Sequence, residues 1–305
     1  MKKGVKILIF VAIGVIVLGI GVCALSLAVG GFDLQKYSFG EETELLTKNI
    51  AIKDAFSSVD VDMETGDIIF VPSKDDSCSV ESVVPDKAEF SAEVRDGTLY
   101  VVCKDTRKWY EKISLFNMTK EKVTLTLPVK DYTGLNIVST SSDLHMPNDF
   151  SFENAAVKII TGDVNFAAKV KNKQSFDVTT GDLCVSESSP KELSVKCFTG
   201  NMQFSDIGCD NMDVVNTTGD IALNNTVSTG DMTIRLTTGD VAFSSCDAKD
   251  IAVKLTTGDV SGTLLSDKEF KADTVTGDVN VPDTTSDGTC EVKVVTGDIN
   301  LKVDK

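Results

Sequence analysis

Hydrophobic and polar residues alternate with period two along most of this chain after residue 50. The alternation is clearest before each copy of a Thr-Gly-Asp tripeptide, whose glycine is taken as position 0. Positions −7, −5 and −3 are mostly apolar, as in Leu193, Val195 and Cys197; Met232, Ile234 and Leu236; and Ile251, Val253 and Leu255. This alternation predicts a β-strand with one buried face. Apolar residues at +2 and +4 predict a second, shorter strand, and the polar residues from +6 to +11 predict a loose corner.

The tripeptide returns every nineteen or twenty residues, which indicates stacked structural units. One unit cannot bury its apolar face alone, whereas stacked units join their inner faces into one core and pair their backbones about 4.8 Å apart. Thr199-Gly200-Asn201 fills the one gap in the series, and residues 140–143 resemble a worn copy. The sequence therefore predicts an all-β protein, a β-solenoid of two-strand coils of 19–20 residues.

The repeat glycines are predicted to form the tight structural corner of each coil. A corner that needs positive φ disfavours other residues by about 1–2 kcal/mol. The following aspartate is expected to cap local backbone N–H groups in an Asx-type turn. The predicted corner residues are Gly162, Gly181, Gly200, Gly219, Gly239, Gly258, Gly277 and Gly297.

The N-terminus differs from the repeats. Lysines at positions 2, 3 and 6 precede a charge-free apolar stretch, Ile7–Val29, which has the length of about 20 residues that a membrane-crossing helix needs. We therefore expect a cytoplasmic tail (1–6), one transmembrane helix (7–29) and everything after it outside the cytoplasm. A cleaved signal peptide is the alternative; the apolar run is longer than the usual h-region of roughly 7–15 residues.

The remaining chain is divided by the regularity of its period. Residues 30–49 are a polar, acidic juxtamembrane connector, and residues 50–305 form the solenoid. Within it, 50–130 are expected to cap the N-terminal end and 131–305 to hold the regular repeats. Residues 109–122 carry charges and no clean period, so they are expected to be an irregular insertion.

Composition limits the partners. The formal net charge is −16, and the first thirty residues contain lysines but no acid, so the predicted exported part is more acidic still. Nucleic acid is a poor partner for such a surface. The cysteines after the apolar stretch occupy no regular ladder and no metal-binding spacing, so we expect small buried apolar residues.

The order of motifs resembles a known family. An N-terminal anchor, "VDVDMETGDI", "DGTLYV", a "VTLTLP" strand and tandem "TTGDV" coils are similar to the family named "putative adhesin", bacterial envelope β-solenoids with a domain of unknown function. The resemblance covers about residues 50–305. It implies a single solenoid domain on a bacterial surface and no catalytic residue.

The +1 residues form the sharpest candidate site. Stacked carboxylates repel one another, and oxygen-rich sites suit calcium, so divalent binding is one hypothesis. The Gly-Gly-x-Gly-x-Asp signature of calcium-binding β-rolls is absent, and turn capping by solvated carboxylates is favoured. The candidate metal residues are Asp220, Asp240, Asp259 and Asp278. No other cofactor is expected.

Catalysis is disfavoured by the sequence. The one histidine, His145, lies on a degenerate coil where an outward polar residue is expected, and no serine or cysteine follows a nucleophile-elbow pattern. We therefore predict a single-pass cell-membrane protein whose solenoid is a non-catalytic binding, adhesin-like or scaffolding module, with an envelope protein or polysaccharide as partner. The alternative is a regulator or sensor of envelope stress acting through a membrane partner.

Overall fold

The computed structural model describes residues 45–107, 121–284 and 288–304, with nine scattered positions between 14 and 29. Those nine positions are helical, but the predicted transmembrane segment 7–29 otherwise lies outside the described residues. Residues 30–44 of the predicted connector 30–49 and most of the insertion 109–122 also lie outside them. Among the positions that the structure describes, no helix has both the length and the apolar character required to cross a membrane.

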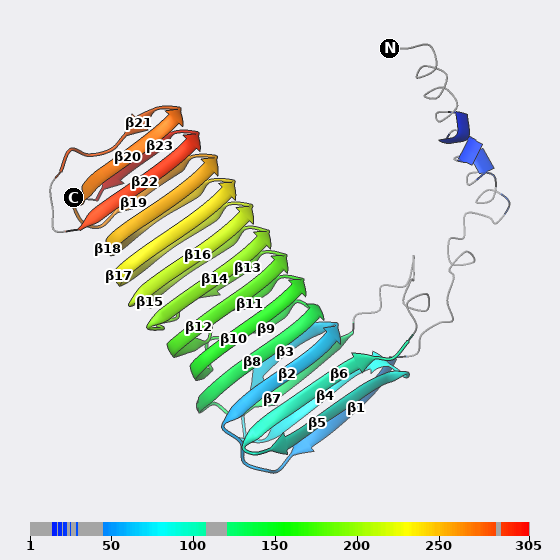
Figure 1. Ribbon diagram of the computed structural model, residues 1–305. Helices are drawn as coiled ribbons and strands as arrows, with labels where there is room; N and C mark the ends of the chain where they lie inside the picture. Colours follow the sequence, from blue (N-terminus) through cyan, green and yellow to red (C-terminus); the bar gives the residue numbers. More distant parts are fainter. Residues whose placement is uncertain are drawn as a thin grey trace. The chain divides into compact units, whose positions relative to one another are not determined.

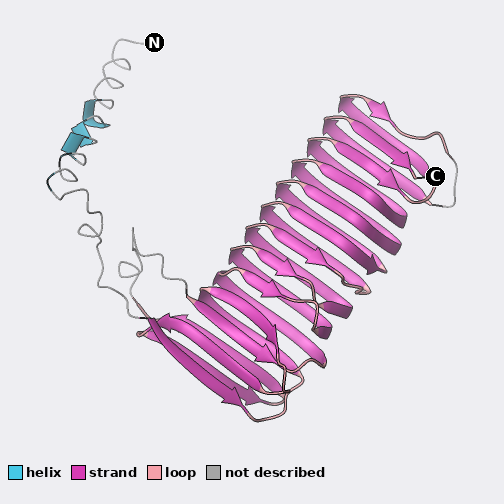
Figure 2. Cartoon of the chain, turned by 180° about the vertical axis from the view of Figure 1, so that it is seen from behind, coloured by secondary structure: helices cyan, strands magenta, loops and turns pink. Residues whose placement is uncertain are grey.

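The described chain from Leu45 onward is a β-solenoid whose two sheets face each other across one core (Figures 1 and 2). The first sheet has the spatial order β5 (Ala88–Arg95), β6 (Thr98–Asp105), β2 (Ser58–Thr65), β8 (Asp131–Ser141), β10 (Ser151–Thr161), β12 (Lys169–Thr180), β14 (Glu192–Thr199), β16 (Asn211–Thr218), the second halves of β17 (Ile221–Thr238) and β18 (Val241–Thr257), β22 (Thr289–Thr296) and β20 (Glu269–Thr276).

The second sheet runs beside it in the same direction of stacking. Its order is β1 (Leu45–Ile52), β4 (Cys78–Pro85), β7 (Lys122–Leu127), β3 (Asp67–Pro72), β9 (Leu144–Met146), β11 (Val164–Phe166), β13 (Leu183–Ser186), β15 (Met202–Cys209), the first halves of β17 and β18, β19 (Val260–Leu264), β23 (Ile299–Val303) and β21 (Val279–Asn280). Pairing is parallel except for β5–β6, β4–β7 and β1–β4 at the N-terminal end.

The core follows from the alternation. In β14, for example, Leu193, Val195 and Cys197 are buried while the residues between them are not. The inner row also carries an aromatic stack in which Tyr132 lies between Phe56 (centroids 6.0 Å apart) and Phe152 (5.5 Å). Since every coil supplies its own inner row, the core is continuous along the stack.

The stacking order departs from the chain order at the C-terminal end. The coil of β18 and β19 pairs with β22 and β23, the last strands of the chain, and these pair in turn with β20 and β21. The final segment therefore lies between two coils that precede it in sequence. Figure 1 shows β22 and β23 inside the stack and β20 and β21 at its end. The repeat pattern does not reveal this order, because all these coils carry the same corner and alternation.

A similar exchange occurs near the N-terminus. β2 pairs with β6 on one side and with β8 on the other, so the first coil is enclosed by two later ones. Beyond β6 and β7, the antiparallel strands β5, β4 and β1 close this end. β1 begins at Leu45, within the segment assigned to the connector.

The loose corner is built around a second column of unusual backbone. The +6 residues Glu187, Asp206, Asn225 and Ser245 have φ of +54°, +56°, +46° and +54°, and none is glycine. Asparagine and aspartate tolerate this left-handed conformation better than other non-glycine residues. In β17 and β18 the bend is absorbed without interrupting the strand.

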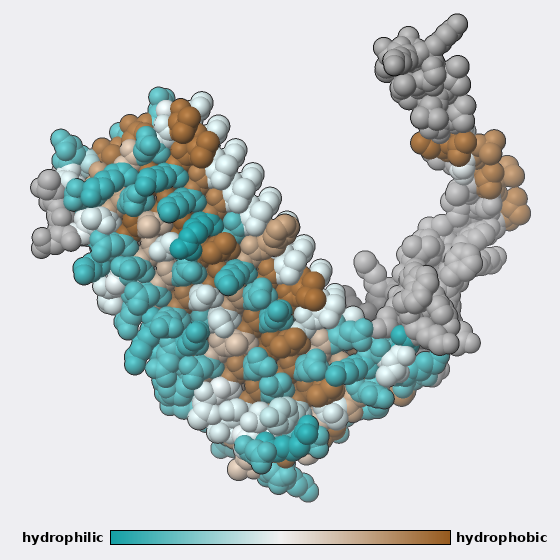
Figure 3. Space-filling view, viewed as in Figure 1, coloured by the Kyte–Doolittle hydropathy of each residue, from teal (hydrophilic) through white to brown (hydrophobic). Residues whose placement is uncertain are grey.

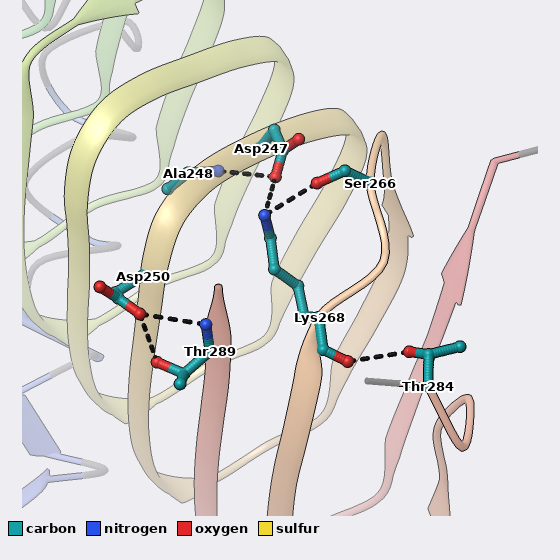
Figure 4. A network of polar contacts seen from close by, with 7 residues as sticks. All are labelled: Asp247, Ala248, Asp250, Ser266, Lys268, Thr284 and Thr289. Atoms are coloured by element: carbon teal, nitrogen blue, oxygen red, sulfur yellow. Dashed lines mark hydrogen bonds and ion pairs between the residues drawn. The ribbon is translucent and has the colours of Figure 1, made fainter. Parts of the chain in front are cut away.

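A buried ion pair between Lys268 and Asp247 lies at this corner near the C-terminal end (Figure 4). Nζ of Lys268 lies 2.8 Å from Oδ1 of Asp247 and also donates to Oγ of Ser266, and the Lys268 side chain is only 6% exposed. Nearby, the Asp250 carboxylate accepts two hydrogen bonds from Thr289, which lowers the pKa of Asp250. These contacts join β18 to the segments before β20 and at the start of β22.

The described cysteines are all free thiols. Cys103, Cys197, Cys209, Cys246 and Cys290 are buried in the core, whereas Cys78 and Cys184 are half-buried. Burial raises the pKa of Cys290 to about 12, so this thiol stays protonated near neutral pH. The five buried cysteines thus behave as small apolar core residues.

The aspartate column as a candidate functional site

The +1 residues form a continuous line along one edge of the solenoid, which we call the aspartate column. In spatial order it contains Asp143, Asp163, Asp182, Asn201, Asp220, Asp240, Asp259, Asp298 and Asp278. Asp143 follows Ser142 and each of the others lies directly after a corner glycine, at the edge where the first sheet turns into the second. Repetition of one short motif therefore creates one long polar surface feature.

Glycine is required at each corner for two reasons. The eight predicted corner glycines have φ between +125° and +149°, so the expected positive φ is present. In addition, a Cβ at Gly239 would overlap the carbonyl oxygen of Gly219 in the preceding coil, and the other corners show the same close approach. Positive φ and backbone contact together exclude any side chain.

The column residues are linked by hydrogen bonds between coils. The backbone N–H of Asp182 donates to Oδ1 of Asp163 (2.8 Å), and that of Asp259 donates to Oδ1 of Asp240 (2.8 Å). Eight such bonds run through the column, including two at Asn201, whose amide oxygen replaces the carboxylate oxygen. The Asx-turn prediction of local capping is therefore wrong: each aspartate caps a backbone N–H of the next coil and not one of its own turn.

The geometry explains why this position needs an oxygen. Except in the end coil, the N–H of each corner glycine and the N–H at +2 donate to carbonyls of the next coil, as Gly219 and Ile221 do to Thr238 and Asp240. The N–H at +1 points the other way, toward the preceding coil. The +1 side chain of the preceding coil accepts this hydrogen bond, so a backbone donor that would otherwise be unpaired is satisfied.

The four candidate metal residues are only partly brought together. Asp220, Asp240 and Asp259 are consecutive in the column, but Asp298 separates Asp259 from Asp278. Within the described ranges, no group of three or more His, Cys, Asp or Glu side chains is arranged to hold a metal ion. Calcium binding at the column therefore stays an untested alternative to turn capping, without a coordination geometry in the described residues.

A shallow groove of about 400 Å³ lies along the middle of the column. Its rim consists of the column residues Asp163, Asp182, Asn201 and Asp220, and its floor includes the outward +3 residues of the second sheet. These are Asn165, Cys184, Gln203 and Ala222. The lining thus combines carboxylate and amide oxygens with amide donors, in rows that repeat at the coil spacing.

A second groove of about 500 Å³ lies on the outer face of the first sheet. It brings Tyr100, Asp60, Asn136 and Ser175 together from β6, β2, β8 and β12. Asn136 donates from Nδ2 to Oδ2 of Asp60 (2.9 Å). Sequence analysis missed this groove because it depends on β2 lying between two later strands.

Outward residues of successive coils align in rows along the stack. Figure 3 shows residues of like hydropathy aligned along the stack on the face in view. The −4 row of the first sheet includes Arg235, Lys254 and Lys293 on three adjacent strands. His145 is exposed in the +3 row beside Asn165, as an outward polar residue should be.

These features define the class of protein, a parallel β-solenoid with glycine corners and an exposed aspartate column. The Toastrack DUF4097 family matches residues 56–244 and 191–305, and the chain belongs to that family. A comparison with curated proteins finds no match.

One solved structure supports the fold, and a second is reported beside it. A crystal structure of a "putative adhesin" from Parabacteroides distasonis ATCC 8503 is 14% identical, covers 86% of this chain and 98% of its own, and has a TM-score of 0.51. A "putative adhesin" from Bacteroides fragilis NCTC 9343 is 17% identical over 84% of this chain and 96% of its own, with a TM-score of 0.44. At such identities the likeness concerns the fold alone.

Proposed function

We propose that this chain is a non-catalytic binding module of the bacterial cell envelope, anchored in the membrane by residues 7–29 with the solenoid outside the cytoplasm. The groove beside the aspartate column is its contact surface. The partner is a cationic, extended segment of an envelope protein. Support comes from the family, from related structures described as adhesins, and from the surface itself.

The single observation that carries the contact surface is the fixed, repeating geometry of the column. Except for Asp278 in the end coil, each Oδ1 of the column accepts a hydrogen bond from a backbone N–H of the next coil, so the carboxylates are positioned before any ligand arrives. The second carboxylate oxygens of Asp163 and Asp182 make no hydrogen bond within the described part of the chain. Positioned acceptors reduce the ordering cost of binding.

Charge decides the class of partner. The chain has a formal net charge of −16, and three of the four column residues on the groove rim are carboxylates. Complementary potentials steer association and exclude like-charged partners. No aromatic ring lines the groove to stack against a sugar, which favours a cationic protein segment over a polysaccharide.

Capture from solubilised envelope extract tests the contact surface. Full-length protein carrying Asn165→Lys and Gln203→Lys should no longer capture the bound protein. The loss of capture should be larger than the loss that added salt causes for the wild type. Ser194→Lys with Thr233→Lys, which places the same charges on the outer face of the first sheet, is the matched control. Equal capture by both variants, or capture of polysaccharide alone, would contradict the proposal.

Fractionation tests the anchor. Full-length protein should sediment with membranes, and protease added outside intact cells should remove the repeats. A soluble protein with a processed N-terminus near residue 32 would show cleavage instead.

A further inference from the structure

The C-terminal end of the solenoid is an open strand edge. In β22, the inner residues Cys290, Val292 and Val294 are buried, whereas the equivalent residues of β20 are partly exposed. The exposed inner row consists of Phe270, Ala272 and Thr274, and in β21 Val279 is 44% exposed. Within the described residues, β20 pairs with β22 on one side and with no strand on the other.

The free edge offers a defined set of backbone groups. The N–H of Glu269 donates to the carbonyl of Gly288, on the β22 side. Backbone groups alternate sides along a strand, so those of Lys271 and Asp273 also point toward β22. Those of Phe270, Ala272 and Thr274 therefore point toward the open edge. An unpaired edge of this kind is a template for another strand.

The outward charges of β20 are complementary to those of β20 in a second, antiparallel copy. Lys271 and Asp273 flank Ala272, and a two-fold axis at Ala272 places each lysine opposite the aspartate of a second copy. Ala272 then faces its own equivalent as a hydrogen-bonded antiparallel pair, as its edge-directed backbone groups require. We propose that β20 pairs antiparallel with β20 of a second copy, centred on Ala272, so that two chains form an end-to-end dimer.

The neighbouring strand extends this charge pattern. Lys293 lies beside Asp273, and Glu291 lies beside Lys271. One row of outward side chains then crosses the axis through β22 and β20 of one chain and β20 and β22 of the other. Its residues are, in order, Lys293, Asp273, Lys271 of the partner subunit and Glu291 of the partner subunit. Charges alternate through four strands, and the symmetric row does the same. Opposite charges on facing strands stabilise pairing, and like charges destabilise it.

The same axis continues the core. Phe270 meets Thr274 of the partner subunit, so the partly exposed inner row of each chain covers that of the other. The contact is isologous, since the same patch is used twice, and it closes at two copies. The N-terminal end differs because its outermost strands, β5 and β1, pair antiparallel with β6 and β4.

Charge reversal tests the dimer. Full-length protein in mild detergent should be dimeric by light scattering. Lys271→Glu should raise the dimer dissociation constant on the order of tenfold or more, because two attractive pairs become repulsive. Adding Asp273→Lys should restore most of the affinity, while Lys254→Glu, two strands from the edge, should leave it unchanged. A monomeric wild type, or a dimer insensitive to Lys271→Glu, would overturn the proposal.

A crosslink tests the register without disturbing the charges. Hydrogen-bonded antiparallel pairs have Cα atoms about 5.5 Å apart, within the range that a disulfide spans. Ala272→Cys should therefore give a disulfide-linked dimer on mild oxidation of membranes, and Ala252→Cys and wild type should not. A charge-sensitive dimer that Ala272→Cys fails to crosslink would refute pairing centred on Ala272.

Discussion

The backbone N–H of Asp298 donates a hydrogen bond to Oδ1 of Asp259, 2.8 Å away, although 39 residues separate them in the chain. Elsewhere in the column the separation is 19 or 20 residues. The bond is the same in both cases. The corner is therefore defined by contact between stacked coils and is independent of the order in which the chain visits them.

The column should tolerate loss of charge but not loss of the acceptor. Asp240→Asn with Asp259→Asn keeps both acceptor oxygens and removes two like charges, so unfolding free energy should be unchanged or slightly higher. The matching alanine pair leaves the N–H groups of Asp259 and Asp298 without their acceptors and should cost about 1 kcal/mol each. Urea unfolding measures both. Millimolar calcium should leave the melting temperature of wild type unchanged; a large calcium-dependent rise would favour an ion site.

Corner glycines should be the least replaceable residues of the coil. Gly239→Ala introduces a Cβ at φ +134° and into the Gly219 carbonyl, so it should destabilise by at least about 2 kcal/mol, and Gly239→Val by more. Gly208→Ala is the control, because its new Cβ would lie 3.8 Å from the nearest atom, Oγ of Ser189. Similar melting temperatures for the two alanine variants would refute the steric explanation.

The loose corner offers a stabilising change. Glu187 has φ +54° and is the least suited of the +6 residues to this conformation. Glu187→Asn should raise unfolding free energy by up to about 1 kcal/mol, and the reverse change Asn225→Glu should lower it similarly. Thermal unfolding of both variants is the measurement. A fall in stability for Glu187→Asn would mean that its hydrogen bond from Asn148 matters more than backbone strain.

Two ion pairs of similar length should differ in strength. Asp247→Ala leaves the buried Lys268 ammonium without its carboxylate and should cost about 3 kcal/mol. Asp213→Ala breaks the 2.7 Å pair with Arg235, whose side chain is half exposed, and should cost less than about 1 kcal/mol. Chemical denaturation separates the two; equal losses would mean that burial does not control the strength of these pairs.

The thiols should react in order of burial. Only the thiolate is nucleophilic, and burial raises the pKa of Cys290 to about 12 and that of Cys209 to about 11. At pH 8 iodoacetamide should therefore modify Cys184, at the groove surface, well before either, as mass spectrometry would show. In urea the difference should disappear. Faster labelling of Cys290 than of Cys184 in the native protein would mean that the end coils open and expose Cys290 to solvent.

Much of the fold was predictable because each local signal repeats. Alternation at −7, −5 and −3 and glycine at position 0 each reflect one physical demand, burial or positive φ. The exchange of the last two coils was not predictable from those signals, since Gly277 and Gly297 stand in the same tripeptide. One signal was present: Ala272 and Thr274 form the least apolar inner row, as suits a coil with only one neighbour.

The candidate site was predictable only in part. The position of the aspartates follows from the repeat, but the acceptor role of Asp163 toward Asp182 depends on the direction of one N–H group, which sequence does not reveal. The groove containing Tyr100 and Asn136 required knowledge that β2 separates β6 from β8.

The placement of β22 and β23 inside the stack also affects biosynthesis. A chain synthesised from its N-terminus presents residues 269–281 before the layer with which they pair, residues 289–303. Until the last residues are synthesised, β20 and β21 lack the strands with which they pair in the folded protein. A product truncated before residue 289 therefore lacks the layer that lies between β18 and β20 in the full-length chain.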